Sequence, residues 1–281
     1  MSVFLSVIIP AFQSAKTIPA LLFSLKNQTR PPDEIIVVDD DSSDKTASCA
    51  KSFGVNVVRN ETNRGPAYAR NCGIKLSQGE ILAFVDADCV CASDWLEKIE
   101  AEFENEGKNV LMGKVMFDPR TLFERAVCDL GFPAGGSVGF ENMWRVEKDG
   151  ETRHLSTCNF SVRKKVFELY GYFDESFPFG GEDVELSERW ISKGVRMYYR
   201  PQIKVEHPVM RGNLTSFVRW HFYRGQGNAC IARNVKSISL CRMMGTRMWS
   251  FFHIVRNSVK TFRFSLVLLL MMIYSKLLKK L

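Results

Sequence analysis

Several features of common protein classes are missing from this chain of 281 residues. Its eight cysteines include no C-x-x-C pair, which argues against a zinc knuckle, and we interpret them as reduced structural thiols. The opening stretch MSVFLSVIIP has no basic leader and no small-residue cleavage site, and its apolar run has the length of a strand. We therefore expect it to form the first strand of a cytosolic domain.

Acidic residues are absent from the C-terminal part of the chain. Residues 208–281 contain 13 Lys and Arg and no Asp or Glu, whereas residues 1–207 contain 25 Lys and Arg against 31 acids. Such a basic tail predicts a polyanionic partner, either a nucleic acid or an anionic membrane. We find no nucleic-acid-binding module, and aromatic residues are interleaved with the basic ones, so the tail favours a membrane surface.

The tail also lacks an apolar run long enough for a transmembrane helix. FSLVLLLMMIY, residues 264–274, has eleven residues, whereas a span needs about 20. This run suits a helix that lies in the membrane interface, with neighbouring lysines on anionic headgroups. A helix packed on the body or on a second subunit is the alternative. We predict one domain at 1–207 and a basic, aromatic-rich helical tail at 208–281, attached to the inner face of the membrane.

Short Val- and Ile-rich runs alternate with helical patterns in the N-terminal part of the chain. The runs are typical of strands covered on both faces, and they lie at 5–10, 34–39, 55–59 and 81–86. Helices are expected between them, at 18–25, 44–53 and 66–77. Because this alternation gives right-handed βαβ units, we predict an α/β fold with a Rossmann-like mixed, mainly parallel sheet flanked by helices. The glycine-rich residues 120–150 are expected to form a flexible loop or lid.

Two carboxylate clusters follow predicted strands. Asp39, Asp40 and Asp41 come after one strand, and Asp86 and Asp88 form a D-x-D pair after another. Ligands bind at the carboxyl ends of strands in parallel sheets. Strand residues two positions apart lie on one face, roughly 6–7 Å apart, so the D-x-D pair could hold Mg²⁺ or Mn²⁺ directly or through a bound phosphate. The structural alternatives are an Asp-rich turn and helix capping.

A third cluster, GGEDVEL at 180–186, places acids at the start of an expected helix. Glu182 and Asp183 could simply interact with the helix dipole there. A general base needs a carboxylate near the acceptor hydroxyl, and Asp183 fits that role. Arg70, in NRGPAYARNCG, could be an ordinary surface arginine, cover a phosphate or orient the D-x-D pair.

Five segments together resemble family 2 glycosyltransferases of the GT-A fold. SVIIPAFQ, DEIIVVDDDSSD, NRGPAYARNCG, GEILAFVDADC and GGEDVEL occur in the order and approximate spacing of that family, over about residues 5–206. The resemblance implies an inverting transfer from a nucleotide-diphosphate sugar, with Mn²⁺ or Mg²⁺ bridging the diphosphate to the D-x-D pair. It also implies that Asp183 deprotonates the acceptor hydroxyl.

The resemblance further implies roles on the nucleotide side. Pro10 and Ala11 would lie beside the nucleoside, Asp40 would bind the base, and Asp39 would lie close by. This chain departs from the family in having Asp41 where Gly is usual, and Phe12-Gln13 where Tyr-Asn is common. No nucleotide preference is therefore carried over.

On the metal side, Asp88 would be the ligand, with Asp86 near the ribose or the ion. His207, in VEHP, is a candidate third ligand. The candidate acceptor-side residues are Glu182, Arg189 and Trp190. Arg189-Trp190 resembles only part of the Q-x-x-R-W pattern of processive synthases.

A membrane-attached transferase suggests a lipid or lipid-linked acceptor, such as a polyprenyl-diphosphate sugar in cell-envelope or surface polysaccharide synthesis. Two other functions stay open. One is a haloacid-dehalogenase-type phosphatase, in which Asp86 is the nucleophile and Asp88 the general acid. The other is a non-catalytic scaffold that binds sugar nucleotides.

Overall fold

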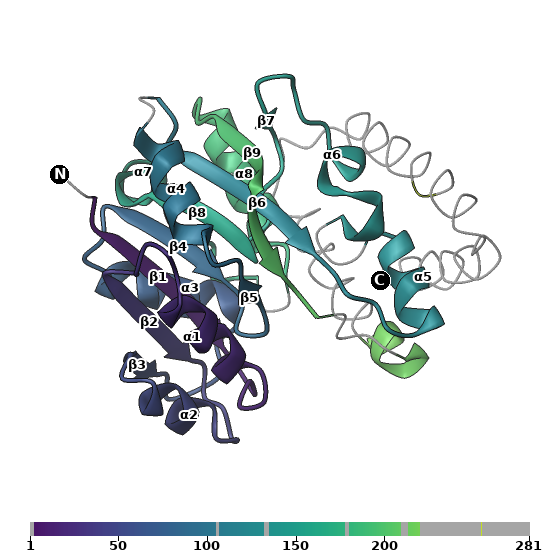
Figure 1. Ribbon diagram of the computed structural model, residues 1–281. Coiled ribbons are helices and arrows are strands. Elements are labelled where there is room, and N and C mark those ends of the chain that lie inside the picture. The colour runs from purple at the N-terminus through teal and green to yellow at the C-terminus, as the bar shows by residue number, and fades with distance from the viewer. Residues whose placement is uncertain are drawn as a thin grey trace.

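The computed structural model describes residues 3–104, 107–131, 135–177, 180–208, 213–219 and 254. Within them a single mixed sheet has the strand order β3-β2-β1-β4-β8-β6-β9-β5, with β7 paired to β9 (Figure 1). The strands are β1 Leu5–Ala11, β2 Glu34–Asp39, β3 Asn56–Arg59, β4 Ile81–Val85, β5 Val90–Cys91, β6 Val110–Met116, β7 Glu151–Thr152, β8 Asn159–Arg163 and β9 Met197–Glu206. The helices are α1 Ile18–Lys26, α2 Thr46–Ser52, α3 Pro66–Leu76, α4 Trp95–Glu104, α5 Leu122–Asp129, the 3₁₀ turn η1 Gly136–Val138, α6 Phe140–Met143, α7 Lys164–Tyr170 and α8 Glu182–Ser192.

Strand direction brings several strand ends to one edge of the sheet. Strands β1 to β4 are parallel. Strand β8 runs antiparallel to both β4 and β6, and β9 is parallel to β6, so β6 and β9 run in the same direction as β4. The carboxyl ends of β1, β2, β4 and β9 therefore share an edge, and the mixed sheet confirms the predicted α/β fold.

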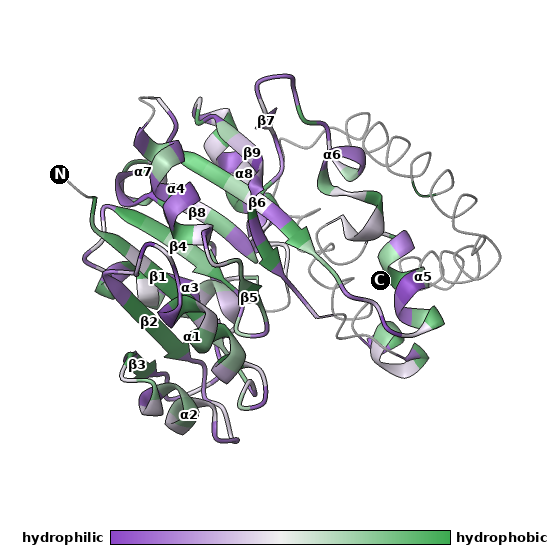
Figure 2. Cartoon of the chain, in the orientation of Figure 1, coloured by the Kyte–Doolittle hydropathy of each residue, from purple (hydrophilic) through white to green (hydrophobic). Residues whose placement is uncertain are grey.

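Helices cover both faces of the sheet. One core contains buried residues of α1, α2 and α4, packed on side chains of β1 such as Val7 and Ile9. The other core contains residues of α3, α7 and α8, packed on Ile8, Leu82 and Phe84. Figure 2 shows the central strands coloured largely as hydrophobic, as expected for strands buried on two faces.

Helix α3 lies unusually close to β1 because of a glycine. A Cβ added at Gly73 would overlap the Cγ2 atom of Ile8. Only a residue without a side chain allows this approach. The position of α3 is thus set by its contact with the sheet, which matters for Arg70 on the same helix.

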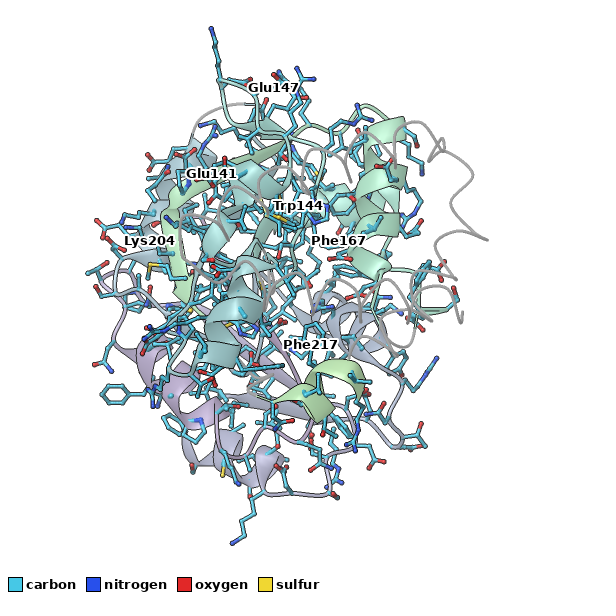
Figure 3. The ribbon with its side chains drawn as sticks, turned by 90° about the vertical axis from the view of Figure 1, so that its right-hand side faces the viewer. Glu141, Trp144, Glu147, Phe167, Lys204 and Phe217 are labelled. Carbon is cyan, nitrogen blue, oxygen red and sulfur yellow. The ribbon has the colours of Figure 1, made fainter. Side chains whose placement is uncertain are left out.

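The predicted loop at 120–150 contains helical structure. Helix α5 begins with a capping box, in which the Thr121 side chain accepts from Glu124 N–H and Glu124 caps the Thr121 backbone, and η1 and α6 follow. Phe217, labelled in Figure 3, and Ile254 belong to the same apolar cluster as Val127 of α5. The prediction of a loop was therefore wrong for these stretches, and a role as a lid stays a prediction.

None of the helices among the described residues is long and apolar enough to cross a membrane. The predicted interfacial helix at 264–274 and most of the basic tail lie outside the described residues.

Candidate active site

The D-x-D pair lies in a turn rather than on a strand. Strand β4 ends at Val85, and the turn that follows is closed by a hydrogen bond of 3.0 Å from Cys89 N–H to the Asp86 carbonyl. The expectation that both side chains share one strand face was therefore wrong. Instead, each of the two carboxylates belongs to a different polar cluster.

Asp86 belongs to a cluster centred on Arg70. The buried Arg70 guanidinium donates from Nη2 to Asp86 Oδ1 at 3.1 Å and from Nη1 to Glu182 Oε1 at 2.8 Å. The Asp86 side chain is 32% exposed, whereas that of Glu182 is only 6% exposed. Burial raises the pKa of Glu182, and the charge of Arg70 opposes this rise. Of the roles predicted for Arg70, orienting the D-x-D pair is the one that these contacts match.

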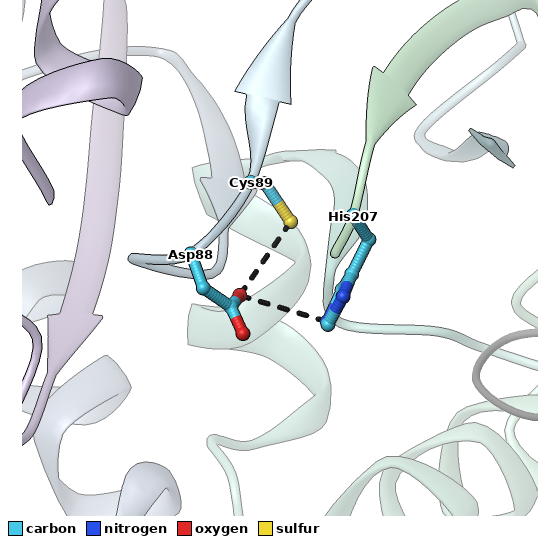
Figure 4. Close-up of side chains that lie close together, drawn as sticks. All are labelled: Asp88, Cys89 and His207. Atoms are coloured by element: carbon cyan, nitrogen blue, oxygen red, sulfur yellow. Dashed lines mark hydrogen bonds and ion pairs between the residues drawn. The ribbon is translucent and has the colours of Figure 1, made fainter. Parts of the chain in front are cut away.

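Asp88 belongs to a second cluster with His207 and Cys89 (Figure 4). His207 Nε2 lies 3.6 Å from Asp88 Oδ1, and one ligand atom from each of the three residues lies within 4.8 Å of the others. His207 Nδ1 is 2.7 Å from the Pro208 carbonyl, which can only accept, so Nδ1 carries a proton. This leaves Nε2, on the side of Asp88, as the nitrogen available to a metal, as is usual for histidine ligands.

The donor types in this cluster are carboxylate, imidazole and thiol. Burial raises the pKa of the Cys89 thiol well above its ordinary value, and the nearby Asp86 adds to the effect. Asp88 and His207, two of the predicted metal ligands, thus lie together at the edge of the sheet, with Cys89 beside them.

The two adjacent aspartates after β2 have different surroundings. Asp40 is 3% exposed, and its carboxylate accepts from Asn60 Nδ2 and from the backbone N–H groups of Arg64 and Gly65. These bonds use its acceptor positions and anchor the start of α3. Asp39 Oδ1 accepts from the Ser42 N–H, but Asp39 Oδ2 is buried without a hydrogen-bond partner. Arg59 Nε lies 3.8 Å from Asp39 Oδ2, an ion-pair contact too long for a hydrogen bond, so Asp39, rather than Asp40, retains a hydrogen-bond acceptor for a ligand.

The turn after β2 keeps a glycine-like conformation although it contains no glycine. Asp41 has φ 60°, in the left-handed region that Gly adopts freely and that Asp tolerates better than most residues. Gln13, after β1, has φ 51°, and its N–H donates to Ser42 Oγ at 2.9 Å. The two strand ends are thereby tied together. Pro10 and Ala11 lie at the end of β1, opposite Val38 and Asp39 of β2.

Helix α8 carries the remaining predicted residues, and its first residue, Glu182, contacts the Arg70 cluster. Asp183 is half-buried there, next to Glu182, and accepts from the Val184 N–H at 2.8 Å. Arg189 instead donates to the backbone carbonyls of Tyr170 and Tyr172.

Trp190 is fully buried against Phe160 and Phe167. Arg189 and Trp190 thus both hold the α7–α8 connection, and an acceptor-side role for them stays a prediction.

Sequence reasoning missed the residues that organise the site from a distance. Asn60, Arg64 and Gly65 hold Asp40, and Cys89 lies beside Asp88. Cys89 directly follows the D-x-D pair, and this position was a usable signal. The contacts to Asp40 come from residues 20 to 25 positions further along the chain, and no local sequence pattern predicts them.

Comparison with known proteins identifies relatives. The model of glycosyl transferase family 2 matches residues 6–171. Glycosyltransferase AglE of Haloferax volcanii is 29% identical over 258 residues, which cover 88% of this chain and 79% of AglE. Glucosyl-dolichyl phosphate glucuronosyltransferase of the same organism is 27% identical and covers 66% of this chain. The chain spans only 62% of that second relative's length.

The fold is also similar to that of a solved structure. The mannosyltransferase PcManGT from Pyrobaculum calidifontis, determined in complex with GDP-Man and Mn²⁺, has a TM-score of 0.63. The sequences are 18% identical, and the match covers 96% of this chain and 74% of that one. The similarity supports the fold, whereas the family match carries the inference about activity and favours a transferase over a phosphatase.

Proposed function

This chain belongs to glycosyl transferase family 2, and we propose that it is a metal-dependent, inverting transferase that moves a sugar from a nucleotide-diphosphate donor to a hydroxyl acceptor. One observation carries the proposal. The D-x-D turn brings Asp88 to His207 and Asp86 to Arg70, Arg70 also binds Glu182, and Asp183 is the residue after Glu182. This arrangement supports a metal-binding pair and a candidate base at one site.

The nucleoside would bind at the ends of β1 and β2. The buried Asp39 Oδ2 has no hydrogen-bond partner, and an unsatisfied buried acceptor costs about 1–3 kcal/mol unless a ligand supplies a donor. A base N–H or a ribose hydroxyl would satisfy it. Pro10 and Ala11 would flank the nucleoside, and Asp40 would act by holding the start of α3, in place of the base contact expected from the sequence.

Asp88 and His207 would hold Mn²⁺ or Mg²⁺. Such an ion, when bound, would neutralise charge on the diphosphate leaving group. Asp86, held by Arg70, would face the ribose or the same ion. The Mn²⁺ and GDP-Man in the PcManGT structure support this assignment by analogy of fold.

Asp183 would act as the general base. It lies in the first turn of α8, next to Glu182. From there it would take the proton of the acceptor hydroxyl, whose oxygen attacks the anomeric carbon as the bond to the diphosphate breaks. The configuration at that carbon is inverted because attack and departure occur on opposite faces.

We further propose a lipid or lipid-linked acceptor, reached from the cytoplasmic face of a membrane. The basic, acid-free residues 208–281 support attachment to anionic lipids. The name of the relative that acts on glucosyl-dolichyl phosphate supports the acceptor class. Reversing the charges of Lys276, Lys279 and Lys280 to Glu should release the protein from anionic vesicles, and unchanged binding would refute attachment through these lysines.

The test of the transferase is nucleoside-diphosphate release from UDP-, GDP- and dTDP-sugars, with Mn²⁺ or Mg²⁺ and membrane lipid extract as the acceptor source. We expect release from one donor that requires metal and extract, is abolished by a chelator and falls by at least about 10²-fold in Asp88→Asn. Asp94→Asn changes the residue just before α4. It is the matched control and should behave as wild type. Phosphate release from simple monoesters that depends on Asp86 would instead support a phosphatase.

A further inference from the structure

We propose that the buried ion pair between Arg70 and Glu182 is a positioning device that fixes the general base Asp183 relative to the donor-site carboxylate Asp86. The inference rests on the proposed function. It assigns Glu182 a role exerted through its neighbour Asp183, and not through a contact with the acceptor.

The geometry of Arg70 joins three elements that are far apart in sequence. Its guanidinium donates 3.1 Å to Asp86, sixteen positions away, and 2.8 Å to Glu182, 112 positions away. Arg70 is on α3, Asp86 begins the turn after β4, and Glu182 is the first residue of α8. One planar group thus sets the separation between the D-x-D turn and the start of α8, because a guanidinium presents its N–H groups at fixed angles.

Helix α3 is held in place by several contacts, so Arg70 has a fixed position from which to hold this pair. Gly73 allows close packing on Ile8, and Asp40 anchors the N-terminal end of the helix. Asn71, next to Arg70, donates to the Phe173 carbonyl at 2.9 Å and accepts from the Phe173 N–H at 3.1 Å. The chain that leads towards α8 is therefore also tied to α3.

Glu182 ties the start of α8 to α3 through its bond to Arg70. The N-cap of α8 is Gly181, with φ 104°, and no side chain caps the helix among the described residues. Gly180, with φ 97°, precedes it. Two glycines give the backbone unusual freedom, so a side-chain contact is needed to hold the first turn in place. The bond from Glu182 to Arg70 is such a contact, and Asp183 is its immediate neighbour.

Burial separates the roles of the two carboxylates on Arg70. The side chain of Glu182 is 6% exposed, whereas that of Asp86 is 32% exposed. Asp86 can therefore meet a ligand, and Glu182 cannot. Glu182 Oε2 and Arg70 Nε are both buried without hydrogen-bond partners, so the pair is not optimised for stability. A buried ion pair is weak evidence for stabilisation, and a role in fixing geometry accounts better for its presence.

A double-mutant cycle tests the proposal. Glu182→Gln keeps the shape of the side chain and removes its charge. We expect transfer kcat to fall by about 10²-fold, the effect of a misplacement of about 1 Å, while donor KM stays within about threefold. In an Asp183→Asn background the same change should reduce kcat by less than about twofold, because the base through which Glu182 acts is already absent.

Two controls distinguish an effect on the position of Asp183 from an effect on folding. Glu185→Gln, on the same helix, removes an ion pair with Arg189 that touches neither α3 nor the D-x-D turn, and it should leave kcat within about twofold. The double variant Arg70→Met, Glu182→Met removes both buried charges; it should recover thermal stability relative to Glu182→Gln but not transfer.

The proposal is overturned if folded Glu182→Gln retains kcat within threefold, or if its effect is equally large with and without Asp183. A raised donor KM with unchanged kcat would also overturn it, since that pattern indicates a donor contact. If wild type turns over none of the donors, the proposed function itself has failed, an outcome distinct from these.

Discussion

The two ends of helix α8 differ in their contacts, although residues from both were candidates for the active site. The first turn contains Glu182 and Asp183, which lie beside the Arg70 cluster. About two turns later, Arg189 and Trp190 bind the α7–α8 connection and the core. Both ends contain residue types common in active sites. The comparison teaches that partners from other elements, here α3 and the segment 170–172, decide which end of the helix joins the polar cluster and which end joins the core.

The strongest test of this difference is Asp183→Asn. We expect kcat for transfer to fall by about 10²–10⁴-fold, because the amide cannot take the acceptor proton. The melting temperature should change little, since Asp183 is half-buried and the substitution is isosteric. Steady-state kinetics together with thermal unfolding would check both. Retained transfer in a folded variant would place the base elsewhere.

Trp190→Ala should show the opposite pattern to Asp183→Asn, with its main effect on stability. Removing a fully buried tryptophan is expected to lower the free energy of unfolding by about 3–5 kcal/mol, measured by denaturant titration. Trp190→Phe should restore much of the stability. Acceptor KM should equal that of wild type in this second variant, and a large rise in a stable protein would support an acceptor role.

Arg189→Leu is expected to have a smaller effect. It removes hydrogen bonds to the Tyr170 and Tyr172 carbonyls and a partly exposed ion pair with Glu185, so we expect a loss of about 1–3 kcal/mol. Acceptor KM should not change. A tenfold rise in KM without loss of stability would contradict the structural assignment.

Glu185→Gln should have the smallest effect on stability. Its bond to Arg189 is an i,i+4 ion pair on one helix, and such pairs contribute about 0.3–0.5 kcal/mol. The expected change in melting temperature is correspondingly small. Added salt should mask part of it, which a comparison at low and high ionic strength would reveal.

The sequence predicted those parts of the fold that rest on local pattern. Strand β2 was placed residue for residue, and the apolar stripe of α1 identified its buried face. The capping box of α5 was equally local, since Thr121 and Glu124 have the S/T-x-x-E spacing, but the glycines after it dominated the interpretation.

The rest depended on contacts between distant segments. Whether Asp39 or Asp40 keeps a vacant acceptor is decided by Asn60, Arg64 and Gly65, which bind only Asp40. The turn that separates Asp86 from Asp88 likewise gives each a partner from another element. Such pairings follow from tertiary packing, and a motif of fixed spacing cannot specify them.

The contact between Gly73 and Ile8 has a consequence for engineering. Gly73 carries no charge and lies within α3, yet any side chain there would push the helix away from β1. Arg70 and Asn71 would move with it. A conservative-looking change in the interior would then displace residues of the candidate active site, and a directed-evolution library that varies Ile8 and Gly73 together would test this while leaving every polar residue in place.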